Sequence, residues 1–126
     1  MIFITGGTGL VGSHILLKLA QQGKPFKALK RNSSSLKTCQ NVFSYYGSLD
    51  LFSKIYWVDG DINDISSLLN GMEGCKFVLH CAALVSYHPS DSQLLRKINI
   101  EGTSNIVNIA LSCGIKKLAY ISSIAA

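Results

Sequence analysis

Residues 1–14 read MIFITGGTGLVGSH: a short apolar run, a turn that contains four glycines, and the start of an apolar-rich segment. The run Ile2–Thr5 is rich in β-branched residues, which predicts a buried strand, and the apolar residues after the turn recur at helical spacing. In a strand–turn–helix unit, glycines let a diphosphate lie against the backbone, where free N–H groups and the positive end of the helix stabilise it. The pattern Gly7-x-Gly9-x-x-Gly12 therefore predicts a dinucleotide-binding turn.

Two alternatives compete with a dinucleotide site at this turn. A P-loop for nucleoside triphosphates has the same glycine spacing, but Ser13 occupies the position of its phosphate-binding lysine. The other alternative is a tight connection between strand and helix that binds no ligand. We interpret the turn as a dinucleotide site and the P-loop as disfavoured.

The remaining chain alternates between strand patterns and helix patterns. Strands are expected at 26–29, 54–58, 76–80 and 118–122, and helices from 11 to about 22, at 65–72 and from about 91 to 113, with 36–52 helical in part. Continuous apolar strands joined by helices indicate an α/β fold with a parallel sheet covered on both faces. We predict one Rossmann-type, doubly wound domain over residues 1–126, with strand order 3-2-1-4-5.

Composition restricts the classes of function. The chain is 48% hydrophobic with a net charge of +5, and its first acidic residue is Asp50, which suits either an ordinary basic surface or a ligand with several phosphates. No zinc-finger pattern or arginine-rich run is present, so we expect no nucleic-acid partner. The four cysteines lack C-x-x-C spacing, which predicts reduced thiols and no metal site. Without a signal peptide or a membrane span, the expected location is cytoplasmic.

The end of the second expected strand indicates which dinucleotide is bound. NAD-binding domains usually place an acidic residue there to hold the ribose 2′-OH. Here the stretch from Ala28 to Asn32 reads ALKRN and contains no acid. Arg31 could pair with a 2′-phosphate, because a guanidinium matches two phosphate oxygens at once. The alternative is a solvated basic loop; we expect NADP(H) to be preferred over NAD(H).

Five ordered motifs resemble those of the extended short-chain dehydrogenases/reductases, the NAD-dependent epimerase/dehydratase family. They are Thr5-Gly6-x-x-Gly9-x-x-Gly12, Gly60-Asp61-Ile62, Leu79-His80-Cys81-Ala82-Ala83, Asn99-x-x-Gly102-Thr103 and Tyr120-x-Ser122-Ser123-x-Ala125-Ala126. The stretches HCAALVSY and SSIAA are most similar to the branch that resembles dihydroflavonol-4-reductase and 3β-hydroxysteroid dehydrogenase. The resemblance extends over nearly the whole chain and corresponds to the N-terminal part of the family fold.

The resemblance implies specific roles for individual residues. Ser123 would be the catalytic serine, with a hydroxyl that hydrogen-bonds a substrate carbonyl. Together with Arg31, the residues expected to contact the cofactor are Gly6, Gly9, Leu10, Val11, Gly12, Asp61, Ile62, Cys81, Ala82, Ala83, Asn99 and Ser122. The family's tyrosine and lysine, spaced Y-x-x-x-K, would follow the Ser-Ser strand, and none of the five tyrosines here has a lysine four residues later.

Simpler structural explanations exist for several of these residues. Asp61 could accept a hydrogen bond from the adenine amino group or could cap a helix, although Asn63 or Asp64 is better placed for capping. A single histidine at the end of a buried strand, such as His80, is more often a satisfied core residue than a catalyst. Asn99, a poor helix former, either faces solvent or is held by a specific polar contact, and the resemblance favours the contact.

These observations predict the N-terminal, dinucleotide-binding part of an NADP(H)-dependent oxidoreductase that reduces a carbonyl or oxidises an alcohol of a small molecule by hydride transfer. The substrate-binding region would follow, and the full-length form could be a homodimer. The alternatives are a non-catalytic NAD(P)-binding module and a nucleotide-sugar epimerase or dehydratase. The fifth strand should form a sheet edge, so we expect the isolated chain to be marginally stable and to associate.

Overall fold

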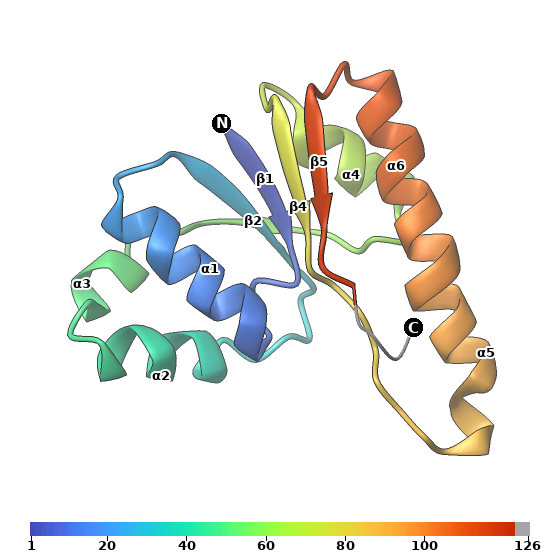
Figure 1. Cartoon of the computed structure of the whole chain (residues 1–126), viewed down its shortest axis with the longest axis horizontal. Helices are drawn as coiled ribbons and strands as arrows, with labels where there is room; N and C mark the ends of the chain where they lie inside the picture. The colour runs from blue at the N-terminus through green and yellow to red at the C-terminus, as the bar shows by residue number, and fades with distance from the viewer. Residues whose placement is uncertain (123–126) are drawn as a thin grey trace.

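A parallel five-stranded sheet with the order β3-β2-β1-β4-β5 forms the centre of the computed structural model, which describes residues 1–122 (Figure 1). The strands are β1 (Ile2–Thr5), β2 (Phe26–Lys30), β3 (Tyr56–Asp59), β4 (Phe77–His80) and β5 (Lys117–Tyr120). All four pairings between neighbouring strands are parallel. This confirms the predicted Rossmann-type sheet and its strand order.

Helices cover both faces of the sheet, as a doubly wound fold requires. They are α1 (Leu10–Gln21), α2 (Lys37–Tyr45), α3 (Leu49–Phe52), α4 (Ile65–Met72), α5 (Ser92–Leu95) and α6 (Thr103–Ser112). In Figure 1, α1, α2 and α3 lie on one side and α4 and α6 on the other. The region 36–52 is therefore helical in part, as its sequence predicts.

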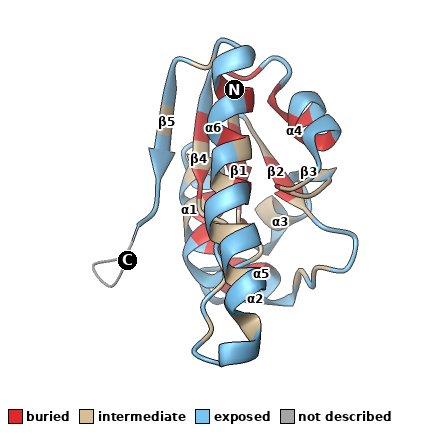
Figure 2. Cartoon of the chain, turned by 90° about the vertical axis from the view of Figure 1, so that its right-hand side faces the viewer, coloured by how far each residue is buried: buried red, intermediate tan, exposed pale blue. Residues whose placement is uncertain are grey.

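Two adjacent side chains of β1 begin two separate hydrophobic cores. Phe3 and Ile4 are both fully buried, and successive side chains of a strand point to opposite faces of the sheet. Phe3 packs with residues of α4, β4 and α6, while Ile4 packs with residues of α1, β2 and α2. The central position of β1 thus fixes both layers, and Figure 2 shows the buried residues concentrated along the inner strands.

The long helix expected at 91–113 is present but is not a uniform α-helix. A 3₁₀ turn (Pro89–Asp91) leads into α5, a π-helix (Arg96–Gly102) follows, and α6 completes the segment. The π-helix departs from the simple 3.6-residue pattern because it closes hydrogen bonds over five residues. Gly102 lies so close to Ile62 that a Cβ would stand 2.4 Å from the Ile62 side chain. The helix therefore packs tightly against the loop that follows β3.

Strand boundaries differ from the predicted ones by one to two residues, and the neighbouring strands explain the differences. β5 was expected to run from Leu118 to Ser122, but its pairing with β4 extends only from Phe77↔Lys117 to His80↔Tyr120. Likewise, β3 begins at Tyr56, opposite Lys27, instead of at Lys54. β5 pairs only with β4 within the described residues and forms the sheet edge. The expected marginal stability and association remain predictions.

Across residues 1–122, none of the helices combines the length and the apolar character needed to span a bilayer. All four cysteines are free thiols in the structure.

Candidate dinucleotide-binding cleft

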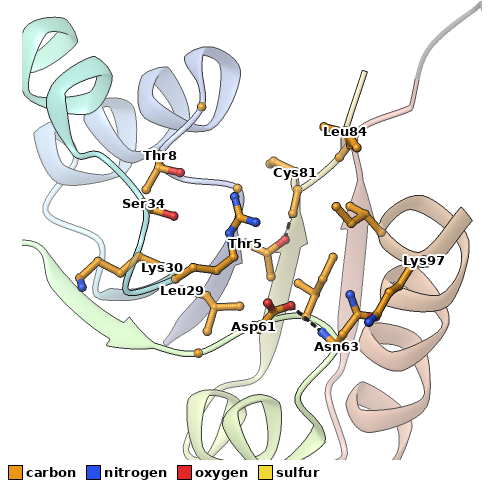
Figure 3. A pocket seen from close by; sticks show the side chains of 18 of the residues that line it. Thr5, Thr8, Leu29, Lys30, Ser34, Asp61, Asn63, Cys81, Leu84 and Lys97 are labelled. Carbon is orange, nitrogen blue, oxygen red and sulfur yellow. Dashed lines mark hydrogen bonds between the residues drawn. The ribbon is translucent and has the colours of Figure 1, made fainter. Parts of the chain in front are cut away.

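A cleft of about 430 Å³ opens at the carboxyl ends of the strands, beside the point where the strand order reverses between β1 and β4 (Figure 3). This is the position at which open α/β sheets bind ligands. The cleft is formed by five parts of the chain: the glycine turn after β1, the end of β2, the loop after β3, the strand extension after β4, and the helical segment that begins with α5. Its lining residues include Thr5, Gly6, Thr8, Gly9, Arg31, Ser34, Asp61, Ile62, Asn63, Cys81, Ala82, Ala83, Leu84, Leu94, Lys97 and Ile98.

The glycines of the first turn meet two different requirements. Gly6 has a φ of 76°, and a Cβ there would stand 2.5 Å from the backbone nitrogen of Ala82. A Cβ on Gly12 would stand 1.9 Å from the carbonyl oxygen of Gly6. Gly9 is different: it is exposed, and the nearest atom to a Cβ there is 3.5 Å away. Gly6 and Gly12 are therefore required for packing, whereas Gly9 leaves open space at the start of α1.

Ser13 holds the glycine turn from inside the protein. Its side chain is fully buried, and its Oγ lies 3.1 Å from the carbonyl oxygen of Gly7 and 2.5 Å from that of Gly9. A residue at this position cannot present a cation to a phosphate on the surface. The geometry therefore argues against the P-loop alternative, which needs a lysine there.

A buried hydrogen-bonded chain joins β1, β4 and α6 directly beneath the cleft. Nδ1 of His80 lies 2.6 Å from the Thr5 hydroxyl, and Nε2 lies 2.8 Å from the Thr103 hydroxyl. The Ala82 N–H also donates to Thr5 Oγ1 at 3.3 Å. The arrangement that satisfies all these groups has the Thr5 hydroxyl donating to Nδ1 and Nε2–H donating to Thr103.

His80 is consequently a satisfied core residue, as its position at the end of a buried strand suggested. Its side chain is fully buried and stacks on Tyr120 of β5, with ring centroids 5.4 Å apart. Burial lowers the pKa of His80 from 6.5 to about 4, because the charged imidazolium would lose its hydration. The imidazole is therefore neutral at pH 7 and links the end of β1 to the start of α6.

The loop after β3 forms a second wall of the cleft. One carboxylate oxygen of Asp61 accepts a hydrogen bond of 2.9 Å from the backbone N–H of Asn63, and Asp64 caps α4 by accepting from Ser66. The residue that caps α4 is thus Asp64 and not Asp61. Asp61 is half-buried and lines the cleft, where its second oxygen accepts no hydrogen bond from a described residue. That oxygen can accept from a ligand amino group.

Two asparagines from the long helical segment position the cleft walls. The side-chain amide of Asn99 accepts from Leu84 N–H at 2.9 Å and donates to Leu84 C=O at 2.8 Å. Asn105 donates to the carbonyl oxygen of Ile62 at 3.0 Å. Asn99 is therefore held by a specific polar contact and does not itself line the cleft. It acts on the cleft through the backbone after β4.

At the end of β2, Arg31 is the cation that remains available to a ligand. Lys30 Nζ lies 2.5 Å from an oxygen of Asp59, which is the one ion pair found among the described residues. Arg31 is exposed and lines the cleft together with Ser34. Figure 3 shows Ser34 and Thr8 on one side of the cleft and Asn63 and Lys97 on the other.

Other predicted contact residues lie outside the cleft lining. Leu10 and Val11 are exposed at the start of α1, and Ser122 is exposed just after β5. Ser123 lies outside the described residues. Cys81 does line the cleft, and burial raises the pKa of its thiol, so it is a neutral group there.

The motifs did not indicate several residues of the lining, among them Thr8, Ser34, Asn63, Leu84, Leu94, Lys97 and Ile98. One signal for three of them was present in the sequence. Leu94, Lys97 and Ile98 are spaced i, i+3 and i+4, so they share one face of a helix. This helical face lies just before Asn99, a residue that the motifs assign to the site.

Comparison with known proteins gives a consistent picture. A family model described as "NAD dependent epimerase/dehydratase family" matches residues 2–126. A putative dihydroflavonol 4-reductase from Synechocystis is 39% identical over 98% of this chain and 33% of its own length. A decarboxylating sterol-4-alpha-carboxylate 3-dehydrogenase from Dictyostelium discoideum is 31% identical over 97% of this chain and 35% of its own length.

A solved structure extends the likeness to three dimensions. A short-chain dehydrogenase/reductase superfamily protein from Agrobacterium tumefaciens, with bound NAD, has a TM-score of 0.78 and 25% identity. The match covers 98% of this chain and 32% of that protein. The chain therefore spans about a third of the length of the relatives it matches.

We predict that Gly12→Ala lowers the stability of the fold, whereas Gly9→Ala lowers only the affinity for the nucleotide. The methyl group of Gly12→Ala would overlap the Gly6 carbonyl, so we expect the free energy of unfolding to fall by about 2–4 kcal/mol. Gly9→Ala has room at extended backbone angles, so its stability should stay near that of the wild type. Its methyl group would occupy the open space expected to hold a diphosphate, so its affinity for a nicotinamide dinucleotide should fall. Denaturant unfolding and titration with NADPH measure the two effects. Equal loss of stability in both variants would contradict this division.

We also predict that His80 makes stability depend on pH. The unfolded chain takes up a proton near pH 6.5 and the folded chain near pH 4, so the unfolded state binds more protons between these values. The free energy of unfolding should then fall by up to about 3 kcal/mol as the pH drops from 6.5 to 4. Unfolding curves followed by fluorescence of Trp57, the single tryptophan, measure this slope.

The comparison variant is His80→Gln, and His14→Gln, at an exposed histidine, is its control. The acid-dependent slope should be reduced in His80→Gln and unchanged in His14→Gln. An unchanged slope in His80→Gln would show that other groups cause the pH dependence.

Proposed function

The chain belongs to the NAD-dependent epimerase/dehydratase family, and from this premise we propose that it is the dinucleotide-binding part of an NADP(H)-dependent oxidoreductase. Its reaction would be reduction of a carbonyl group or oxidation of an alcohol in a small-molecule substrate. The observation that carries the preference for NADP(H) is the composition of the β2 end, where Arg31 stands at the cleft and no acidic residue is present between 28 and 32.

The residues of the cleft fit the separate parts of the cofactor. The open backbone at Gly9 and the N-terminus of α1 suit the diphosphate, because the first N–H groups of a helix have no partner within it. The free oxygen of Asp61 suits the adenine amino group. The guanidinium of Arg31, assisted by Ser34, suits the 2′-phosphate. When bound, the nicotinamide supplies or accepts the hydride.

The electrostatics at the end of β2 favour a phosphate over a neutral hydroxyl. The carboxylate of Asp59 is already paired with Lys30, so it does not neutralise Arg31. An exposed guanidinium without a carboxylate partner has its donors free for the three oxygens of a phosphate. A ribose 2′-OH, by contrast, is normally held by a carboxylate at this place.

The catalytic part of the proposal rests on the end of β5. Ser122 lies two residues beyond Tyr120, the last residue of that strand, and Ser123 comes next in the sequence. A serine hydroxyl there would hydrogen-bond the substrate carbonyl, which makes the carbon a better hydride acceptor. For the whole enzyme, the proposal includes this hydride-transfer chemistry, a cytoplasmic location and a homodimeric full-length form.

We predict that Arg31→Asp reverses the choice of cofactor. Removing a charge-assisted hydrogen bond costs about 1.5–3 kcal/mol, so NADPH affinity should fall about 10- to 100-fold. The new carboxylate can accept from the ribose 2′-OH, so NADH affinity should be kept or increased. Calorimetric titration of the 126-residue chain with NADPH and NADH measures both affinities.

A matched control makes the same change in charge far from the cleft. Lys116→Asp lies at the start of β5, at the opposite edge of the sheet, and should leave the ratio of the two affinities unchanged. Wild-type binding of NADH as tight as that of NADPH would overturn the NADP(H) preference. Failure to bind either nucleotide would overturn the dinucleotide site itself.

The reaction type is tested separately from the cofactor. A full-length form acting as an oxidoreductase should consume NADPH stoichiometrically with a carbonyl compound. An epimerase or dehydratase would turn over a nucleotide sugar with no net loss of the reduced cofactor. A non-catalytic module would bind the nucleotide and do neither.

A further inference from the structure

The amino ends of the strands, which lie at the end of the sheet opposite the cleft, are rich in lysine. Four of the five strands begin beside one or more lysines: Lys24 and Lys27 at β2, Lys54 at β3, Lys76 at β4, and Lys116 and Lys117 at β5. Because all strands are parallel, their starting points share one edge, seen at the end of the sheet where the N-terminus is marked in Figure 1.

Backbone hydrogen bonds confirm that these strand starts are neighbours. Lys116 N–H donates to the carbonyl oxygen of Lys76 at 2.8 Å, and Lys76 N–H donates to that of Met1 at 3.0 Å. Ile2 N–H in turn donates to the carbonyl oxygen of Pro25, the residue after Lys24. The lysines thus form a row across adjacent strands, which lie about 5 Å apart.

The whole net charge of the chain resides at this edge. Lys18, in the last turn of α1, belongs to it as well, so the edge holds seven of the 12 lysines and arginines but only two acids, Asp50 and Glu73. The five remaining cations and the five remaining acids balance. The balancing cations are Lys30, Arg31, Lys37, Arg96 and Lys97, and the acids are Asp59, Asp61, Asp64, Asp91 and Glu101.

These lysines are available to an external partner. Lys24, Lys54, Lys76, Lys116 and Lys117 are exposed, and none of the edge lysines forms an ion pair within the described residues. Lys27 is half-buried, donates to the carbonyl oxygen of Glu73 and lies over the Tyr56 ring. The Glu73 carboxylate therefore does not neutralise Lys27 by direct contact.

Exposed apolar side chains stand between the lysines. Phe77 follows Lys76 and is 40% exposed, Tyr56 begins β3 and is 60% exposed, and Leu111 in the last turn of α6 is 76% exposed. Such a mixture suits the boundary between water and lipid, where lysines meet anionic headgroups and apolar side chains enter the acyl region.

We propose that this lysine edge, defined by Lys18, Lys24, Lys27, Lys54, Lys76, Lys116 and Lys117, docks on the surface of an anionic lipid membrane. A cluster of several lysines is attracted to anionic headgroups without specific geometry. A nucleic-acid surface is disfavoured, because all seven cations are lysines and arginine is the residue suited to bidentate phosphate contacts. The proposal does not depend on the function of the cleft.

Docking at this edge would leave the cleft accessible. The cleft lies at the carboxyl ends of the strands and the lysine edge at their amino ends, so the two surfaces face in opposite directions. A membrane-bound chain could therefore exchange its ligand with the aqueous phase. Its affinity for a dinucleotide should be the same with and without vesicles.

The test is co-sedimentation of the 126-residue chain with lipid vesicles. We expect binding to phosphatidylcholine vesicles that contain about 30% phosphatidylserine, little binding to pure phosphatidylcholine, and release at about 0.5 M salt. Each lysine near an anionic surface contributes a factor of about five, so the double variant Lys76→Gln with Lys116→Gln should lower the partition coefficient about 10- to 30-fold.

The matched control removes the same charge from the opposite half of the molecule. The double variant Lys37→Gln with Arg96→Gln should bind the anionic vesicles within about twofold of the wild type. Circular dichroism verifies that both variants are folded. Equal loss in the two variants, or equal binding to neutral vesicles, would overturn the proposal. So would binding to a DNA duplex in the absence of binding to anionic vesicles.

Discussion

The close approach between the glycine turn and the strand extension after β4 is the constraint on which the site depends. Gly6 packs directly on the backbone of Cys81 and Ala82, so a side chain there would separate the two segments. Gly12 packs on the carbonyl of Gly6, so a side chain there would push the start of α1 away from the turn. The Thr5–His80 hydrogen bond ties the same two segments from below. Backbone packing and a buried neutral imidazole together therefore set the width of the cleft. The polar groups that would meet a ligand are carried on this frame.

The long helical segment supports the frame from the other side of the sheet. Thr103 completes the hydrogen bonds of His80, Asn99 holds Leu84, and Asn105 holds the carbonyl of Ile62. Three polar residues of one segment thus reach three different parts of the cleft. Asn99 lies within the π-helix, whereas Thr103 and Asn105 follow it in α6, so a change of helical phase separates the contact of Asn99 from the other two.

Sequence patterns predicted the fold well, because strand and helix periodicities are properties of local residues. The strand order and the glycine turn followed from them, whereas strand ends were set by pairing partners such as β4 for β5. In the site, Gly9, Arg31 and Asp61 were predicted and do line the cleft. Leu84 was not, since its position depends on the contact with Asn99, which joins two separate segments of the chain. Lys97 was not either, although its helical spacing with Leu94 and Ile98 was present in the sequence. Asn99 itself was assigned to the cofactor but contacts backbone instead.

The two ends of this small domain differ in their balance of positive and negative charge. At the carboxyl ends of the strands cations and acids balance, and Arg31 forms no ion pair with any described residue at the cleft, while Asp59 is paired with Lys30. The recognition proposed there would rest on the geometry of single groups, because the summed field is small. At the amino ends, the lysines have almost no acids to oppose them, and their fields add. A uniform excess of lysine attracts an extended anionic surface rather than one ligand. The same net charge of +5, which in the sequence suited a phosphate-bearing ligand, is located in the structure at the other end of the molecule.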